Sequence, residues 1–363
     1  MSRLFSTAPT VSAQALPTPQ AAPAEEAAAA WPALPALAGE RLDEAQLADI
    51  AAQAGARARA KSTVRCYTSC WRGFEDFCRR RGRASLPASP ETVQLYLGEL
   101  IADRYKPGSI GVILAALNHH HRDAGHPSPA QDRRVKETFE GYKRLCVGTP
   151  LAAQSKDPLM ADDITAVCEV LDARGGIKEV RDKALILLGF GGAFRSCEPT
   201  YLHIEHFRFD RKGMTLLLPY SKTDQDGRGA HVGIVRAPRA EVCPVLAIRR
   251  WFDVLARHGI TAGPICRSIR PTAGGGVAFS DTAMIAHTLR VMLKQHCERA
   301  GIDASNIAWH SVRRGHVTQA FRNGASLADV QKTGRWAKAD TVMLYYDEVE
   351  ALESSSSRHL WKS

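Results

Sequence analysis

Apolar residues recur at helical spacing through most of the chain after residue 40. Within 62–81 they fall three or four positions apart and define one helical face. The residues of this face are Val64, Tyr67, Trp71, Phe74 and Phe77. Residues 89–91 (Ser-Pro-Glu) then supply a helix start, with an N-cap hydroxyl, an early proline and an acid. With 109–124 and 130–145, these segments predict a four-helix domain.

The second half of the chain combines helices with a short sheet. Residues 162–173 and the apolar run 179–190 predict helices. Residues 214–221 and 230–235 have strand character, and the polar segment 222–229 between them predicts a hairpin loop. Further helices are predicted at 243–258, 281–300, 310–323, 326–333 and 340–353. We therefore expect a mainly α fold with a small antiparallel β-sheet.

Composition divides the chain into four parts. Residues 1–40 are rich in Ala and Pro, and we expect a disordered leader there because proline at this density prevents a stable helix. A helical domain is predicted at 41–147, and a linker that begins with Gly-Thr-Pro at 148–158. The remainder, 159–363, is predicted to form a mixed α+β domain with a C-terminal tail.

Charge points to a polyanionic partner. The 363 residues include 48 Lys and Arg against 38 Asp and Glu, which gives a formal net charge of +10. Both predicted domains are net positive, which favours a clamp around nucleic acid. The nine cysteines include no Cys-x-x-Cys pair, which argues against a zinc ribbon and for reduced thiols. No apolar run reaches the ~20 residues needed to cross a bilayer, and no secretory signal is recognisable.

Several side chains of the second domain are suited to chemistry. Each has an ordinary explanation by itself, as a surface ion pair, a solvated charge or a core aromatic ring. Their order and spacing are more informative than any one of them. In chain order they are Arg195 with Glu198 three residues later, Lys222, His310 with Arg313 at i, i+3, then Trp336, and Tyr345 nine residues after it.

This ordered set resembles the signature of the tyrosine recombinase (phage integrase) family, which is Arg, Lys, His-x-x-Arg, His or Trp, and a nucleophilic Tyr. Trp336 at the third motif is similar to the Cre-like members, and the spacing of nine selects Tyr345 over Tyr346. One departure is Arg335, which stands between Gly334 and the tryptophan. By resemblance the catalytic residues are Arg195, Lys222, His310, Arg313, Trp336 and Tyr345, with Glu198 in support.

The resemblance spans about 41–353 and implies both fold and activity. The first domain would be a SAM-like core-binding domain and the second the catalytic domain, as in the simple two-domain Cre and Xer members. The enzyme would cleave and rejoin DNA strands through a 3′-phosphotyrosine and a Holliday junction. The resemblance implies no metal, ATP or other cofactor.

The residue types suit this reaction. Transfer of a phosphodiester to tyrosine passes through a five-coordinate phosphorus whose nonbridging oxygens gain negative charge, and the Arg195 and Arg313 guanidiniums can hold those oxygens. His310 can donate a hydrogen bond or accept the tyrosine proton, and Trp336 can donate its indole N–H and exclude water. Lys222 is the expected acid for the leaving 5′ oxygen. The identity of the general base stays open.

Double-stranded DNA is the expected partner. Three consecutive histidines at 119–121 point to different helical faces and make a poor metal site, so we expect a phosphate or solvent role for them. A solvated basic face explains many of the arginines of the first domain equally well. The candidates for DNA contact are Lys61, Arg65, Arg72, Arg79, Arg80, Arg133, Arg134, Lys143 and Arg144.

The resemblance also implies a homo-tetramer on two DNA sites, with no membrane association and a cytoplasmic location at the bacterial nucleoid. The tail 347–363 would dock into a neighbouring protomer, although a frayed end is the simpler alternative. Its expected anchors are Val349, Leu352, Leu360 and Trp361. Two other functions use similar residues: a type IB topoisomerase or telomere resolvase, and a DNA-binding protein that retains the fold without catalysis.

Overall fold

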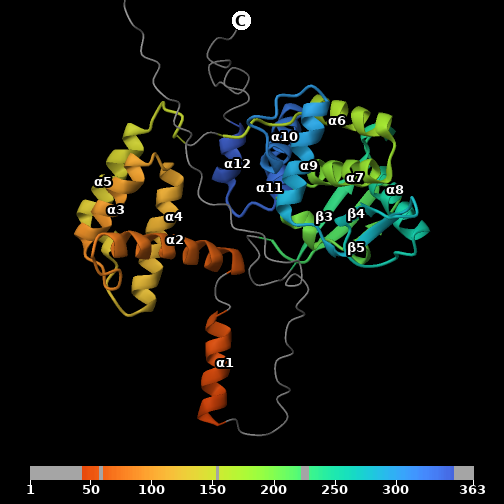
Figure 1. Ribbon diagram of the computed structural model, residues 1–363. Helices are drawn as coiled ribbons and strands as arrows, with labels where there is room; N and C mark the ends of the chain where they lie inside the picture. The colour runs from red at the N-terminus through yellow and green to blue at the C-terminus, as the bar shows by residue number, and fades with distance from the viewer. Residues whose placement is uncertain (1–42, 57–59, 153–154, 222–228, 347–363) are drawn as a thin grey trace, which may run out of the picture. The chain divides into compact units, whose positions relative to one another are not determined.

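The computed structural model describes residues 43–56, 60–152, 155–221 and 229–346 (Figure 1). Contacts within the described chain divide it into two units, the first ending at Ser155 and the second beginning at Lys156. This division falls within the segment 148–158 that the sequence predicts as a linker. The predicted leader, 1–40, lies outside the described residues.

The first unit is helical, as the periodicity predicts. Its buried face comes from the aromatic residues of α2, with Phe74 and Phe77 packed on Tyr96 of α3. The Ser89 hydroxyl accepts a hydrogen bond from the Thr92 N–H at 3.2 Å, which confirms the predicted N-cap. The helices are α1 (Glu44–Ala56), α2 (Lys61–Arg80), α3 (Pro90–Ala102), α4 (Pro107–Asp123) and α5 (Arg133–Leu145).

The three histidines at 119–121 lie on α4, and the prediction of a phosphate or solvent role is wrong for the last of them. His121 is fully buried, and its Nε2 accepts a hydrogen bond from the Ala88 N–H at 3.0 Å. Its Nδ1 therefore carries the proton that is donated to the Leu117 carbonyl at 2.9 Å. His120 stacks on Trp71 with ring centroids 4.6 Å apart. The sequence did not reveal that this part of α4 faces the α2 aromatics.

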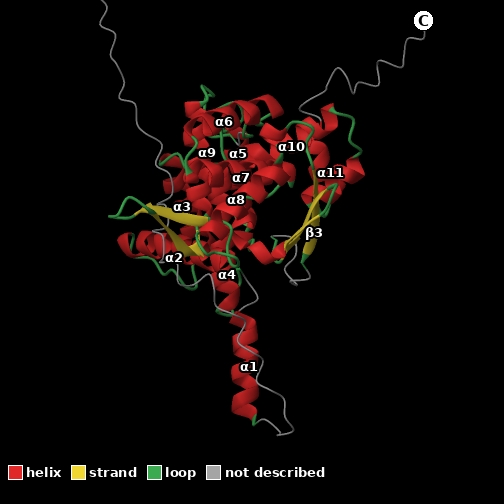
Figure 2. Ribbon diagram, turned by 90° about the vertical axis from the view of Figure 1, so that its right-hand side faces the viewer, coloured by secondary structure: helices red, strands yellow, loops and turns green. Residues whose placement is uncertain are grey.

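The second unit contains two small antiparallel sheets, whose strands are yellow in Figure 2. The first sheet has the order β1-β2-β3 and the second pairs β4 with β5. Its strands are β1 (Phe207–Phe209), β2 (Gly213–Leu218), β3 (Ala230–Val235), β4 (Arg267–Pro271) and β5 (Val277–Ala283). Its α-helices are α6 (Ala161–Arg174), α7 (Ile177–Gly191), α8 (Pro244–Arg257), α9 (Ala286–Arg299), α10 (Trp309–Arg322), α11 (Leu327–Gly334) and α12 (Ala339–Tyr346). The predicted fold class, mainly α with a small antiparallel sheet, is confirmed.

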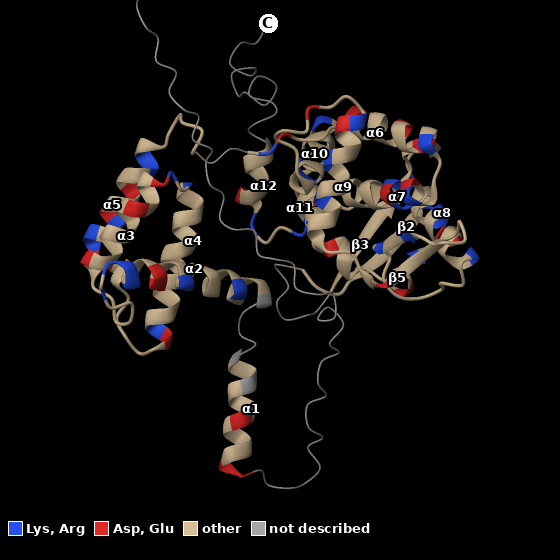
Figure 3. Cartoon of the chain, in the orientation of Figure 1, with Lys and Arg blue, Asp and Glu red and all other residues tan. Residues whose placement is uncertain are grey.

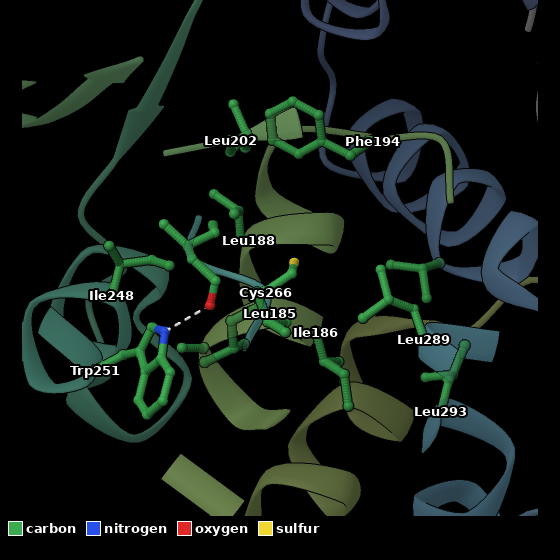
Figure 4. Close-up of a cluster of buried hydrophobic side chains, with 14 of the residues drawn as sticks. Leu185, Ile186, Leu188, Phe194, Leu202, Ile248, Trp251, Cys266, Leu289 and Leu293 are labelled. Carbon is green, nitrogen blue, oxygen red and sulfur yellow. Dashed lines mark hydrogen bonds between the residues drawn. The ribbon is translucent and has the colours of Figure 1, made fainter. Parts of the chain in front are cut away.

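Helix α7 is the centre of the second unit and contacts α6, α8 and α10 (Figure 1). Its second half, residues 184–191, is apolar on nearly all sides, and a helical segment of that kind is stable only when neighbouring elements cover it. Figure 4 shows part of this core, in which the Trp251 indole N–H donates to the Ile265 carbonyl at 2.9 Å. The core holds the C-terminal end of α7 at a fixed position, and Arg195 follows that end.

A buried ionic network fixes the other end of α7. Asp182 is completely buried and accepts hydrogen bonds from the Arg181 Nε at 2.8 Å and the His296 Nε2 at 2.9 Å. Arg181 also donates to the Arg267 carbonyl at 2.9 Å, which joins α7 to β4. Buried charges persist when they are paired and hydrogen-bonded in this way. Helix α7 is thus anchored to α9 and β4 by polar contacts as well as by packing.

One sequence prediction needs correction. Residues 281–300 were expected to form a single helix, but β5 extends to Ala283 and α9 begins only at Ala286. The hairpin of β4 and β5 was not predicted at all. Its strands carry polar and apolar residues without clean alternation, and pairing with each other rather than local pattern stabilises them. All nine cysteines are free thiols. No helix in the described ranges is long and apolar enough to cross a membrane.

Candidate active site

A cleft of about 620 Å³ opens where the end of α7 meets α10, α11 and α12. It contains five of the six predicted catalytic residues. The sixth, Lys222, lies outside the described residues. The residues that line the cleft are Arg195, Ser196, His310, Arg313, Trp336, Ala337, Lys338, Thr341 and Tyr345.

Arg195 follows a tight turn at the end of α7. Ala193 has a φ of 48°, a left-handed conformation that ends the helix and redirects the chain toward the cleft. The Glu198 carboxylate is 0% exposed and accepts hydrogen bonds from the Arg195 Nη1 at 2.7 Å and the Arg195 backbone N–H at 2.8 Å. The predicted partnership of these two residues is therefore an ion pair at the base of the cleft. It orients a guanidinium that keeps 20% of its surface exposed.

Arg313 lies deeper, on the inner face of α10, with only 2% of its surface exposed. Its Nη1 donates to the Ala193 carbonyl and its Nη2 to the Gly334 carbonyl at 2.5 Å. The guanidinium stacks 3.8 Å from the ring centroid of Trp336. Burial, together with the positive charge of Arg195, lowers the pKa of Arg313 to about 9. The protein therefore holds a cation here at a cost that a bound anion would reduce.

The structure places Trp336 in the cleft despite the extra residue before it. Arg335 adopts a left-handed conformation, φ 58°, at the C-terminus of α11, and the chain turns back there. The Trp336 ring then packs directly against Gly334, where any side chain would collide with it. Trp336 lies between Arg313 and Tyr345, and its ring centroid is 5.9 Å from that of Tyr345.

Tyr345 lies near the end of α12, and its hydroxyl faces His310. The Tyr345 Oη and His310 Nε2 are 3.3 Å apart. Burial and the charges of Arg313, Arg314 and Arg195 lower the pKa of His310 below its ordinary value. The imidazole is consequently neutral at pH 7 and can accept a proton at one of its ring nitrogens.

The cleft can therefore bind an anion beside a phenol. Two arginines, a neutral histidine and an indole line the cleft together with Tyr345, and one carboxylate, Glu198, partly offsets the positive charge. Cys197 lies next to this set, but burial and the Glu198 charge raise the pKa of its thiol. The thiol therefore stays protonated at pH 7.

The sequence model of the phage integrase family matches residues 158–351, more than half of the chain. The chain belongs to the phage integrase family. It is therefore a tyrosine recombinase, as the ordered residues predicted.

Two curated relatives of this recombinase are similar over most of their length. One, an integrase/recombinase XerD homolog of Selenomonas ruminantium, is 29% identical over 308 residues, which cover 84% of this chain and 87% of the relative. The other, the Cre recombinase of Escherichia phage P1, is 22% identical over 308 residues, which cover 81% of this chain and 86% of the Cre chain. A structure of lambda integrase bound to DNA superposes with a TM-score of 0.52 at 16% identity and covers 84% of this chain and 94% of that one. At this low sequence identity, the superposition shows that the two proteins share a fold.

Sequence reasoning missed three polar residues of the recombinase site. Arg335 donates to Glu198, and Arg314 lies 5.7 Å from the ring centroid of Tyr345. His316, which is half-buried, donates from Nδ1 to the Phe190 carbonyl at 2.7 Å and joins α10 to α7; desolvation lowers its pKa to about 4. Arg314 and Arg335 were visible only as charges beside motif residues, and nothing local showed that they point inward.

The basic residues predicted to bind DNA differ in their surroundings. Arg65, Arg72 and Arg79 recur every seven residues on α2 and form one exposed stripe, part of the blue seen on this helix in Figure 3. Five of the predicted residues, Arg79 of the stripe among them, are in ion pairs: Arg79 with Asp76, Arg80 with Glu99, Arg133 with Glu137, Arg134 with Asp132, and Lys143 with Glu140. Among the described residues, Arg65, Arg72 and Arg144 have no acidic partner. Lys61 is the first residue of α2.

Proposed function

We propose that this recombinase is site-specific and cleaves and rejoins DNA through a 3′-phosphotyrosine at Tyr345 and a Holliday junction, without metal or ATP. The observation that carries the proposal is the position of the Tyr345 hydroxyl. It lies 3.3 Å from the His310 Nε2, on the wall of a cleft that is also lined by Arg195 and Arg313.

The geometry supports a division of roles. Arg195 and Arg313 hold the nonbridging oxygens of the scissile phosphate and stabilise the charge that develops on them. The Trp336 indole covers the Arg313 guanidinium and excludes water. His310, neutral at pH 7, accepts the Tyr345 proton. Lys222 protonates the leaving 5′ oxygen, a role that rests on the family pattern.

DNA binding would begin with phosphate contacts. The α2 stripe of Arg65, Arg72 and Arg79 spaces its charges by about 10 Å, since seven helical residues rise about 1.5 Å each. Residues Arg65 and Arg72 are the best candidates, because an arginine already paired with a carboxylate loses that contact when it moves to a phosphate.

Assembly is proposed from the relatives. One matched structure is a lambda integrase tetramer bound to a Holliday junction. We propose that this chain also acts as a homo-tetramer on two DNA sites at the bacterial nucleoid. The tail anchors Val349, Leu352, Leu360 and Trp361 would contact a neighbouring protomer; they lie outside the described residues.

Covalent trapping tests the proposal. The protein is incubated in EDTA with sheared DNA from its host, including the region around its own gene, and is then denatured with SDS. We expect protein that stays attached to DNA, and sequencing of the trapped fragments identifies the site. A requirement for two copies of that site separates a recombinase from a type IB topoisomerase. Trapping that occurs only with magnesium present would contradict the metal-free mechanism.

The pH dependence of cleavage tests the role of His310. Because burial and the nearby arginines lower the pKa of His310 below its ordinary value, the imidazole is mostly neutral at pH 7, and acidification through that lowered pKa protonates the acceptor. We expect a single-turnover cleavage rate that is nearly constant from about pH 8 to 7 and declines only at acidic pH, below the ordinary range of histidine titration. His310→Gln should be slower and should lack this acid-dependent decline. The same decline in His310→Gln would assign the titration to another group.

A further inference from the structure

Arg335 is a third arginine of the site, and it contacts the cleft only through other residues. Its side chain is 8% exposed, and it is not among the described residues that line the cleft. Its Nη2 donates to the Glu198 Oε2 at 2.8 Å, while Arg195 holds the Oε1 of the same carboxylate at 2.7 Å. Glu198 is therefore clamped between two guanidiniums, and only one of them, Arg195, reaches the cleft.

The same side chain joins two loops that are distant in sequence. Arg335 follows α11, and its Nη1 donates to the Thr333 carbonyl at 2.7 Å and, across the site, to the Gly192 carbonyl at 3.1 Å. Its guanidinium also lies 4.7 Å from the ring centroid of Phe194. The loop that carries Arg195 and the loop that carries Trp336 are thus connected by one planar fork.

The hydrogen bond from Arg335 to Glu198 affects the orientation of the Arg195 side chain. Among the described residues, no acceptor contacts the Nε or Nη2 of Arg195, so these atoms are available to a ligand in the cleft. The direction in which the Nε and Nη2 point depends on Glu198, whose Oε1 accepts a hydrogen bond from the Nη1 of the same guanidinium. Without Arg335, the buried Glu198 carboxylate would lose one of its two cationic partners and could rotate. The Arg195 guanidinium would then be less well oriented.

We propose that Arg335 is a positioning residue for strand cleavage: through Glu198 it fixes the direction in which Arg195 faces the nonbridging oxygens of the scissile phosphate. The inference rests on the proposed function, because it requires that phosphate to bind in the cleft. It assigns a use to the residue that separates Gly334 from Trp336.

The test compares two substrates that differ only at the scissile position. One carries the ordinary phosphate and the other a methylphosphonate, in which a neutral methyl group replaces one nonbridging oxygen. Single-turnover cleavage on the trapped site is measured for the unchanged chain and for Arg335→Gln, Arg335→Lys, Arg195→Gln and the double variant Arg195→Gln/Arg335→Gln. Arg322→Gln, an exposed arginine on α10, is the matched control. Thermal unfolding and burst amplitude report the folded fraction separately from the rate constant.

On phosphate we expect Arg335→Gln to slow cleavage by about tenfold to a hundredfold, since small misplacements of a catalytic group have effects of this size. Arg335→Lys should restore part of the rate, and Arg322→Gln should leave it unchanged. On methylphosphonate the defects of Arg335→Gln and Arg195→Gln should shrink together, because less charge develops for Arg195 to stabilise. The double variant should be no slower than Arg195→Gln alone, as expected when one residue acts through the other.

Three results would overturn the inference. They are equal slowing of Arg335→Gln on both substrates, a defect that multiplies that of Arg195→Gln, and a reduced burst amplitude with an unchanged rate constant. The last would show that Arg335 serves folding alone. Absence of cleavage by the unchanged chain on the trapped site would instead overturn the proposed function, and this inference with it.

Discussion

Replacement of Tyr345 by Phe should abolish the covalent protein–DNA adduct, with a loss of at least about a thousandfold. The phenol oxygen is the only atom removed, and it is the proposed nucleophile. The ring would keep its packing against Trp336, while the 3.3 Å contact with the His310 Nε2 would be lost. Since that contact is partly exposed, the free energy of unfolding should change by less than about 1 kcal/mol. SDS-resistant attachment to the trapped DNA is the measurement.

Tyr346→Phe is the matched control, because it removes the same oxygen from the adjacent residue of α12. It should retain the adduct. Loss of the adduct only in Tyr346→Phe would move the nucleophile by one residue. An adduct that survives in both variants would mean that neither tyrosine is the attacking group, and DNA binding without any adduct in the unchanged chain would favour a non-catalytic protein.

Removal of the Arg313 fork should have the next largest effect. We expect Arg313→Gln to lower the single-turnover cleavage rate by at least about a thousandfold, the size of loss seen when an arginine that stabilises a phosphoryl transition state is removed. Binding of the DNA site should weaken far less, because phosphate contacts elsewhere supply most of the affinity. Rate constants and equilibrium binding, measured on the same oligonucleotide, separate the two effects.

Arg313 is buried, so its loss also removes a donor from the Gly334 carbonyl and from the Ala193 carbonyl, which then keeps only the 3.4 Å contact from the Arg335 Nη2. Arg313→Lys keeps the charge but not the planar fork, and it should remain slow for that reason. Arg322→Gln on the same helix should have the activity of the unchanged chain. Cleavage by a folded Arg313→Gln within tenfold of normal would contradict the assignment, and thermal unfolding establishes that the variant is folded.

These predictions share one electrostatic cause. Three guanidiniums, those of Arg195, Arg313 and Arg335, gather around the single Glu198 carboxylate. Burial lowers the pKa of Arg335, as it does for Arg313, and the Glu198 charge partly opposes this shift. A site with excess buried positive charge is complementary to a phosphate that gains negative charge in the transition state.

Most of the helices, and a set of residues that lie together in one cleft, could be predicted from the sequence alone. Periodic apolar residues fixed α2, α3 and α7 to within a few positions, since burial of one face is a local property of the pattern. The order Arg, His-x-x-Arg, Trp, Tyr identified residues that the structure brings to one cleft. Order and spacing suffice here because His310 and Arg313 share the first turns of α10, while Arg195, Trp336 and Tyr345 each lie at or just after the end of another helix.

Only the tertiary structure decided which polar groups point inward. His119, His120 and His121 are consecutive and identical, yet of the three only His121 is fully buried, where its Nε2 accepts a hydrogen bond from the Ala88 N–H of a distant loop. The β4 and β5 strands exist because they pair with each other. Arg335 had no local sign of a role, since its partners, Glu198 and the Gly192 carbonyl, lie more than a hundred residues away. A charged side chain can be buried only where a partner of opposite charge or a hydrogen-bonding group lies beside it, and long-range packing decides which group that is.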